Sequence, residues 1–400
     1  MTDIHYDSLY IDTGSSSTFC RLESASVDDL GTYGRYGCDA PKPLVDVMME
    51  DLQLYLSDHD DVTQVITLGD FPAHEYTNQS DWLHSFMNST SFLFSAVDAV
   101  SDVPIFPTIG NDDCYPNYTI PAGSSDLLDI ITLVFDNFFE SDEEAEFFAE
   151  FGGLKRELSD TITLLSFNSI YYSPKHNSKK LHVLRGEKVE YEDDPAGQFA
   201  WLESEFQIAQ EAGKSVWLAT HIPPGVNAYD SRDQWVDQYT DSFLDILAQY
   251  PNLVTAFFSG HYHQVEYKFV AETPIFVCPG ISACNGNNPG YSIFEYDDST
   301  GLIVNQTVRF LDIRNANRDS DTSVSQLMSY SDAYPSTIDE GFISGLSLSE
   351  LAEDIRTNVK IWEQYYDYQL LGYNPSRGQT ACASVVSTET TYDQCDIAED

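Results

Sequence analysis

Five short motifs of Asp, Asn and His residues follow one another along the chain, each placed where a predicted strand ends. They are Asp3-Ile4-His5, Gly69-Asp70, Gly110-Asn111-Asp112, His221 and Gly260-His261-Tyr262-His263. Short apolar runs that stop at glycine are typical of buried strands, and segments of helical period lie between them. Because loops at strand ends converge in layered α/β folds, we expect these side chains to gather at one edge of a sheet.

The periodicity of apolar residues predicts an α/β domain over residues 1–310. Helices are expected over 42–57, 80–100, 125–139, 198–212 and 235–250. Strands are expected over 62–68, 103–109, 162–167, 181–184, 216–219, 254–258, 274–278, 291–296 and 302–310. Residues 311–400 form an extension, in which Ser347 and Glu350 provide a capping box for a helix over about 347–371, followed by a cysteine-bearing tail.

Only Met1 and Thr2 precede the first motif. A strand of so few residues is too short for the centre of a sheet. We therefore expect natural sequence upstream of this residue, with a targeting segment.

The charge of the chain is strongly acidic, with 65 acidic and 19 basic residues and a formal net charge of -46. A field of that sign repels nucleic acids and anionic lipids, so binding to a nucleic-acid duplex through a broad basic surface is excluded. No apolar run approaches the roughly 18 residues that a transmembrane helix needs. The composition does not determine the oligomeric state.

Seven cysteines and four Asn-x-Ser/Thr sequons favour a secretory or lysosomal compartment, or a vacuolar lumen, over the cytosol. The sequons place candidate glycans at Asn78, Asn88, Asn117 and Asn305. The expected disulfides are Cys20–Cys38, Cys382–Cys395 and Cys278–Cys284, which leaves Cys114 as the odd cysteine.

The motifs together offer carboxylate, amide and imidazole groups in the number that a pair of cations needs. Two metal ions require about seven ligands, with one carboxylate shared between them. Imidazole combined with carboxylate oxygen favours zinc, iron or manganese over magnesium or calcium. Two divalent ions, with zinc as the expected metal, are therefore predicted as cofactors.

Longer stretches around the motifs resemble the calcineurin-like metallophosphoesterases, and among them the acid sphingomyelinase-like phosphodiesterases, which have endopolyphosphatase relatives. The stretches are Thr2-Asp-Ile-His-Tyr-Asp7, Gly31-Thr-Tyr-Gly-Arg-Tyr-Gly-Cys-Asp-Ala-Pro41, Gly69-Asp-Phe-Pro-Ala-His74, Gln198-Phe-Ala-Trp-Leu-Glu203 and Thr220-His-Ile-Pro-Pro-Gly225. The resemblance spans about residues 1–310 and implies a two-sheet β-sandwich flanked by helices, with a small helical subdomain at the C-terminus.

By this resemblance, the two cations share seven ligands. One would be held by Asp3, His5, the bridging Asp70 and His263. The other would be held by Asp70, Asn111, His221 and His261. A hydroxide between the two ions would then attack phosphorus in line.

Two further residues are candidates for the proton that the leaving group needs. His74 stands four residues after Asp70 in a loop rich in glycine and proline, from which it could reach the leaving group. The resemblance also implies a histidine directly after Asn111, but this chain has Asp112. Asp112 would act as an acid only at low pH, or else His74 acts alone.

The predicted function is metal-dependent hydrolysis of a small-molecule or lipid phosphodiester, as in the sphingomyelin phosphodiesterases. An endopolyphosphatase, or a nucleotide phosphodiesterase or phosphatase, is the alternative enzyme. A non-catalytic glycoprotein on the same scaffold would have lost ligands, and none is lost here. A serine hydrolase of the α/β type is excluded because no Gly-x-Ser-x-Gly motif occurs.

Overall fold

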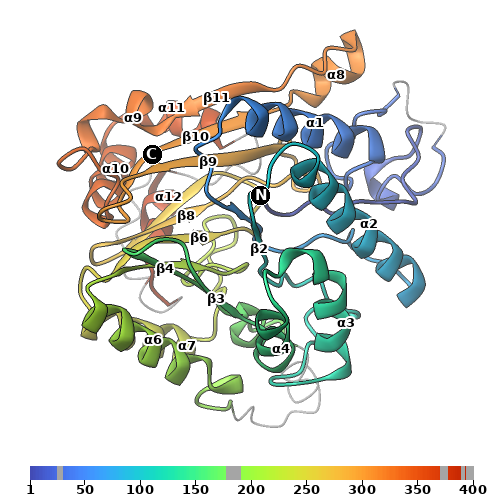
Figure 1. The fold of residues 1–400 in the computed structure, drawn as a ribbon. Coiled ribbons are helices and arrows are strands. Elements are labelled where there is room, and N and C mark those ends of the chain that lie inside the picture. Colours follow the sequence, from blue (N-terminus) through green and yellow to red (C-terminus); the bar gives the residue numbers. More distant parts are fainter. Residues whose placement is uncertain (25–29, 177–190, 370–376, 389–391, 393–400) are drawn as a thin grey trace, which may run out of the picture.

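The computed structural model describes residues 1–24, 30–176, 191–369, 377–388 and 392, and it shows strands at the centre with helices around them (Figure 1). A six-stranded sheet has the order β3-β4-β5-β6-β8-β7, a three-stranded sheet has the order β11-β10-β9, and β1 pairs with β2. The strands are β1 (Val65–Ile66), β2 (Ile105–Phe106), β3 (Leu154–Glu157), β4 (Ile162–Ser166), β5 (Ser215–Ala219), β6 (Val254–Ser259), β7 (Glu266–Val270), β8 (Thr273–Val277), β9 (Gly290–Tyr296), β10 (Ile303–Phe310) and β11 (Ser325–Ser329).

The two larger sheets pack face to face through aromatic side chains. The ring of Phe294 on β9 lies 4.8 Å from that of Phe258 on β6 and 5.1 Å from that of Phe276 on β8. Neighbouring residues of a strand face opposite sides. Phe257 accordingly points the other way and meets Phe243 of a covering helix, with ring centroids 5.8 Å apart. The expected α/β sandwich is confirmed.

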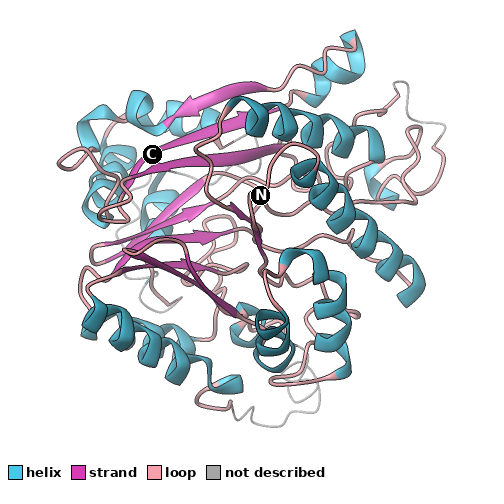
Figure 2. Cartoon of the chain, in the orientation of Figure 1, coloured by secondary structure: helices cyan, strands magenta, loops and turns pink. Residues whose placement is uncertain are grey.

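Helices lie on the outer faces of this sandwich (Figure 2). They are α1 (Lys42–Asp58), α2 (Gln79–Asp98), α3 (Asp126–Val134), α4 (Asp142–Phe151), α6 (Gln198–Ala212), α7 (Asp237–Gln249), α8 (Ile313–Asp319), α9 (Tyr330–Ala333), α10 (Gly345–Thr357), α11 (Val359–Tyr368) and α12 (Arg377–Ser384). Their ends follow local chemistry. The side chain of Asn78 accepts a hydrogen bond from Asp81 N at the start of α2, and Gly213 ends α6 in the left-handed conformation.

Helix α1 is tied to the three-stranded sheet by one carboxylate. Asp51 accepts a hydrogen bond of 2.6 Å from the hydroxyl of Tyr291 on β9. It also accepts two from Arg309 on β10, at 2.8 Å from Nε and 2.6 Å from Nη2. A bidentate pair of this kind fixes geometry as well as charge, so Asp51 sets how α1 lies on the sheet.

The Asp51→Ala variant is expected to unfold more easily by about 2 kcal/mol, because the tyrosine hydroxyl and the guanidinium both lose their acceptor. Thermal and urea unfolding of the metal-loaded protein measure this. Asp46→Asn, on an exposed turn of the same helix, is the control and should change stability by less than about 0.5 kcal/mol. An Asp51→Ala protein as stable as the wild type would contradict the role given to this carboxylate.

The C-terminal part is more ordered than the sequence indicates. Residues 311–345 contain α8, α9 and strand β11, which pairs antiparallel with β10. The single helix expected over 347–371 is wrong. The capping box is formed by Ser344 and Ser347, so that α10 begins at Gly345. Asn358 then interrupts the helix, because its extended backbone ends α10 and its side chain caps α11.

Two sets of predicted strands differ from the structure in other ways. The runs 62–68 and 103–109 contribute only two paired residues each to β1 and β2. At the end of the first run, Leu68 N donates instead to Met1 O of the N-terminal segment, at 2.9 Å. The strand expected over 181–184 lies outside the described residues.

Candidate metal centre and active site

The seven side chains predicted as metal ligands converge at strand ends. The loops after β1, β2, β5 and β6 supply five of them: Asp70, Asn111, His221, His261 and His263. The other two, Asp3 and His5, lie on the N-terminal segment, which runs beside the loop after β1. Asp3 N donates to Gly69 O at 3.0 Å, and His5 N donates to Asp70 O at 3.2 Å. The fold thus brings together side chains that are as far apart in sequence as residues 3 and 263.

One half of the centre is formed by Asp3, His5 and His263. Asp3 Oδ1 lies 3.2 Å from His263 Nε2 and 3.7 Å from His5 Nε2. Asp70 Oδ2 is 3.6 Å from the same nitrogen of His5. These separations between ligand atoms leave the room that one cation needs.

The other half is formed by Asn111, His221 and His261. His221 Nε2 lies 3.0 Å from Asp70 Oδ2, 3.1 Å from Asn111 Oδ1 and 3.3 Å from His261 Nδ1. The same oxygen of Asp70 therefore faces both halves of the centre. A carboxylate in that place is suited to bridge two ions.

Backbone carbonyl groups set the orientation of three of the four histidines. The pairs of Nδ1 and carbonyl oxygen are His5 with Pro72 at 2.9 Å, His221 with Leu68 at 2.6 Å and His263 with Ser282 at 3.1 Å. A histidine that donates from one ring nitrogen presents the other as a ligand. His261 instead turns Nδ1 toward the centre.

Two buried polar atoms at this place lack a hydrogen-bond partner among the described residues. They are Asp3 Oδ1 and His5 Nε2, both on side chains with 0% exposure. Buried polar atoms are nearly always satisfied, so an orphaned oxygen and nitrogen that face each other point to a missing partner. Divalent cations with a preference for imidazole and carboxylate fit both atoms.

The backbone at the centre is held in an uncommon conformation. The ligands with positive φ are Asp3 (51°), His5 (42°), Asp70 (59°), His261 (76°) and His263 (61°). Residues other than glycine rarely adopt this left-handed region, and where they do the strain is concentrated at functional sites. The surrounding fold therefore imposes the positions of these ligands.

Gly110 allows the closest approach of two ligand loops. A Cβ atom at this position would lie 2.2 Å from Asp70 Oδ1 and 2.3 Å from Asp70 N. We expect Gly110→Ala to displace Asp70 and to lower the metal content well below that of the wild type, as measured by elemental analysis. Gly123→Ala, where a Cβ would meet nothing within 4 Å, should cost only the backbone strain of its positive φ. Equal metal content in both variants would contradict this.

His74 lies over the metal ligands, with its ring stacked on that of His5 at a centroid distance of 3.9 Å. Its Nδ1 is 2.9 Å from Asp39 Oδ1, and its Nε2 is 3.6 Å from Asp112 Oδ2. Burial disfavours the charged form of His74, but the carboxylate of Asp39, with Cys284 and Asp112, raises its pKa well above the usual value. The neighbouring acidic groups therefore favour the protonated form of His74 beside the predicted metal ligands.

Asp39 is a residue of the site that the motif analysis missed. Besides His74 Nδ1, it accepts hydrogen bonds from His74 N at 2.8 Å and from Ser282 Oγ at 3.1 Å. Arg21 Nη2 donates to His74 O at 2.7 Å. The signal was present in the stretch from Gly31 to Pro41, where Asp39 follows a cysteine.

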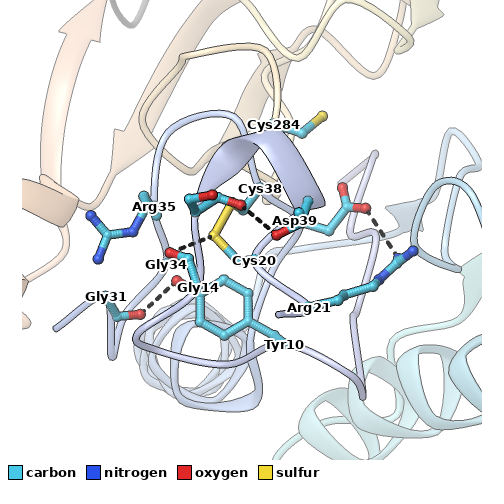
Figure 3. Close-up of a disulfide and its surroundings, with 12 residues drawn as sticks. Tyr10, Gly14, Cys20, Arg21, Gly31, Gly34, Arg35, Cys38, Asp39 and Cys284 are labelled. Carbon is cyan, nitrogen blue, oxygen red and sulfur yellow. Dashed lines mark hydrogen bonds and ion pairs between the residues drawn. A yellow bond between two sulfur atoms is a disulfide. The ribbon is translucent and has the colours of Figure 1, made fainter. Parts of the chain in front are cut away.

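Figure 3 shows a disulfide with Arg21 and Asp39 near it. Cys20 and Cys38 are bonded, as predicted. Arg21 follows the first cysteine and Asp39 follows the second, so the bond holds together two of the residues that contact His74.

The second cysteine pair, Cys278 with Cys284, was wrongly predicted. Both are free. Cys278 is buried at the end of β8, whereas Cys284 Sγ lies 3.6 Å from His263 Nδ1 in the site. Cys114 is free and buried, as expected for the odd cysteine. The pair Cys382–Cys395 remains a prediction, because Cys395 lies outside the described residues.

Two acidic residues follow Asn111, and they have different surroundings. Asp112 Oδ2 accepts from Asn111 Nδ2 at 2.6 Å, and its backbone N–H donates to Asp70 Oδ1 at 2.7 Å. Asp113 accepts from three backbone N–H groups, those of Asp70, Phe71 and Gly110. Burial raises the pKa of each carboxyl group to about 7.

A cavity of about 820 Å³ opens onto this centre. Its lining includes the tyrosines Tyr118, Tyr229 and Tyr262, the acids Asp112, Asp230 and Asp233, and the bases Lys175 and Arg232. The cavity thus offers aromatic faces with charges of both signs beside the ligands.

The candidate glycosylation sites differ in exposure. Asn78 and Asn117 are exposed, whereas Asn88 and Asn305 are partly buried. Asn305 Oδ1 accepts from Ser329 Oγ and Ser331 N, and its Nδ2 donates to Glu295. Modification at all four positions remains a prediction. None of the described helices is long and apolar enough to pass through a bilayer.

Comparison with known proteins decides the family. The family model described as calcineurin-like phosphoesterase matches residues 1–265. The chain belongs to this family. The convergence of the seven predicted ligands agrees with that assignment.

The names of similar curated proteins indicate which type of phosphoester the family member hydrolyses. The chain is 26% identical to the sphingomyelinase phosphodiesterase D of Dictyostelium discoideum, over 91% of this chain and 81% of that protein. It is 28% identical to the sphingomyelinase phosphodiesterase C of the same organism, over 76% of this chain and 70% of that protein. A rat protein described as cyclic GMP-AMP phosphodiesterase is 23% identical, over 94% and 84%. The chain is accordingly a metal-dependent hydrolase of the phosphodiesterase type.

Proposed function

We propose that the protein hydrolyses small phosphodiesters of the sphingomyelin type at two zinc ions. One ion is held by Asp3, His5, Asp70 and His263, and the other is held by Asp70, Asn111, His221 and His261. The observation that supports this assignment is the convergence of these seven side chains, with two orphaned buried atoms pointing at the centre. Bound divalent cations supply Lewis acidity at the phosphoryl group and lower the pKa of the attacking water.

His74 supplies the proton for the leaving group. Its ring lies directly over a ligand histidine, and its Nε2 faces the site while Nδ1 is engaged by Asp39. This is the arrangement of a general acid whose tautomer is fixed by a carboxylate. Asp112 contacts Asn111 and stands 3.6 Å from His74. We assign it to holding these two side chains and leave the proton transfer to His74.

The substrate class follows from the lining of the cavity. Three carboxylates and three tyrosines surround the space beside the ligands, against two basic side chains. Aromatic faces together with carboxylates suit a quaternary ammonium group such as choline. A long polyanion is disfavoured by these acids and by the net charge of -46.

Nucleotide diesters are the second candidate. Lys175 and Arg232 line the cavity, and Lys175 Nζ lies 5.5 Å from the ring centroid of Tyr118. A cation beside an aromatic face suits a phosphate attached to a base. The rat relative whose name includes cyclic GMP-AMP gives this candidate further support.

A secreted or lysosomal-type location is proposed as well. The Cys20–Cys38 disulfide requires an oxidising compartment to form and persist. Two sequon asparagines, Asn78 and Asn117, are exposed as glycosylation requires.

A substrate panel at about pH 5, with and without added zinc, tests the proposed function. It contains bis-p-nitrophenyl phosphate, p-nitrophenyl phosphorylcholine, sphingomyelin in detergent, ATP and polyphosphate. Zinc-dependent release from the two choline esters is the expected result. If the protein prefers ATP or polyphosphate, the proposed substrate class is wrong, but the proposed metal centre stands. No turnover of any substrate by a metal-loaded protein would overturn the proposal.

A further inference from the structure

Lys268 on β7 has a buried ammonium group that joins separate parts of the chain. Its side chain has 0% exposure, and its Nζ donates hydrogen bonds of 2.7 Å to Val226 O and to Ala383 O. Burial lowers the pKa of this group to about 8. Keeping a charge in such a place is costly, and an apolar side chain of the same volume would avoid that cost. The two hydrogen bonds therefore need an explanation other than overall stability.

The first partner, Val226, lies in the first arm of a hairpin over residues 225–234, which forms one wall of the cavity. Gln234 N donates to Gly225 O at 2.9 Å, and Asn227 N donates to Arg232 O at 3.0 Å. The hairpin supplies six of the residues that line the cavity: Asn227, Tyr229, Asp230, Arg232, Asp233 and Gln234. The position of Val226 consequently affects the shape of the space for the substrate.

The second partner, Ala383, belongs to α12 in the C-terminal extension. Beyond this helix, Val386 N donates to Phe269 O at 3.1 Å, so the extension pairs with the edge strand β7. It also approaches the hairpin closely, since a Cβ atom at Gly225 would lie 3.3 Å from Val386 Cα and from Ser387 N. Val226, Ala228, Cys382, Ala383 and Tyr392 form a separate small core between the two.

Lys268 also lies beside the metal-binding loop. Its Nζ is 5.8 Å from the ring centroid of Tyr262, which stands between the ligands His261 and His263 and lines the cavity. One ammonium group thus contacts the hairpin, the C-terminal extension and the tyrosine between two ligands.

We propose that Lys268 is a positioning residue for substrate binding, which fixes the 225–234 hairpin against the C-terminal extension. The inference rests on the proposed function, in which the cavity binds the phosphodiester. It gives the C-terminal extension a part in substrate recognition, although its described residues include no predicted metal ligand.

Two diesters with the same leaving group test this. Bis-p-nitrophenyl phosphate and the p-nitrophenyl ester of thymidine 5'-phosphate both release p-nitrophenolate, but the second retains a larger group in the cavity. Lys268→Met should raise KM for the thymidine ester by roughly fivefold. KM for the smaller diester, kcat for both and the metal content should each change by less than about twofold.

A double-mutant cycle identifies the route of this effect. Tyr229→Ala removes a side chain of the wall itself, and its KM effect should not add to that of Lys268→Met if the lysine acts through the hairpin. Lys155→Met is the control, because Lys155 lies on β3 at the opposite edge of the sheet, where it pairs with Glu157 of the same strand and Glu205 of α6. Gly225→Ala disturbs the contact between the hairpin and the C-terminal extension and leaves the lysine unchanged. It takes the place of Lys268→Met if the lysine variant does not fold.

Hydrogen exchange provides a readout that does not depend on turnover. Lys268→Met should increase exchange in residues 225–234 and 380–388 and leave the loops after β1 and β2 unchanged. Unchanged exchange in the hairpin would overturn the inference, even if the wild type hydrolyses neither diester and the proposed function fails. An equal rise in KM for both diesters, or additive effects in the cycle, would overturn it while the proposed function stands.

Discussion

An Asp70→Asn variant is expected to lose at least about a thousandfold of kcat on every phosphodiester and to bind fewer than two metal ions per chain. Asp70 Oδ2 faces both halves of the centre, at 3.0 Å from His221 Nε2 and 3.6 Å from His5 Nε2. The neutral amide keeps the shape of the side chain but cannot supply the charge that a bridging ligand provides. Loss of several kcal/mol of transition-state stabilisation corresponds to this change in rate.

Elemental analysis and steady-state kinetics on the same preparation measure both parts of the effect. Asp46→Asn on α1 is the matched control, because Asp46 is half exposed and pairs only with Lys42 among the ion pairs of the described residues. It should keep the wild-type rate and two metal ions. If Asp70→Asn kept the wild-type kcat and bound two metal ions, the bridging role assigned to Asp70 would be wrong.

The second large effect is expected for His74→Gln, and it should depend on the leaving group. A diester that releases an alkoxide, such as sphingomyelin, needs a proton, and its kcat should fall by about a hundredfold to ten thousandfold. A diester that releases p-nitrophenolate needs no proton, so its kcat should fall by less than about tenfold. His74 has the position for this, with its ring 3.9 Å from that of His5 and its Nδ1 bound to Asp39.

Asp39→Asn is the companion variant. The amide oxygen can still accept from His74 Nδ1, but without the charge that favours the protonated ring. We expect a fall of about tenfold for the alkoxide substrate only. Equal losses on both kinds of leaving group in His74→Gln would show that the residue supports the site without transferring a proton.

The predictions from sequence succeeded where one local pattern determines the result. Helix α6 was placed residue for residue, because its apolar period and Gly213 define both ends. The seven predicted ligands do converge on one place, and all their motifs except the first, Asp3-Ile4-His5, follow an apolar run. Their role as metal ligands remains a prediction. The order of these motifs along the chain then indicated the family, since no single motif is specific enough.

The predictions failed where distant segments determine the result. Asp39 follows a cysteine in sequence, but its contact with His74 exists only in the fold, where the Cys20–Cys38 disulfide and Ser282 lie beside it. Cys278 and Cys284 are close in sequence, but the fold buries one at the end of a strand and turns the other into the cavity. The paired edge strand β7 and its contact with the C-terminal extension were likewise invisible, because they depend on long-range pairing.

The spread of the ligands along the chain, from residue 3 to residue 263, has a consequence for biogenesis. Closing such a long loop costs conformational entropy. Packing of both sheets must offset this cost before the ligands are close enough to bind a cation. Until then the centre is a set of acids and imidazoles that are scattered over most of a nascent polypeptide. We therefore expect metal to bind late in maturation and to stabilise a fold that is already assembled.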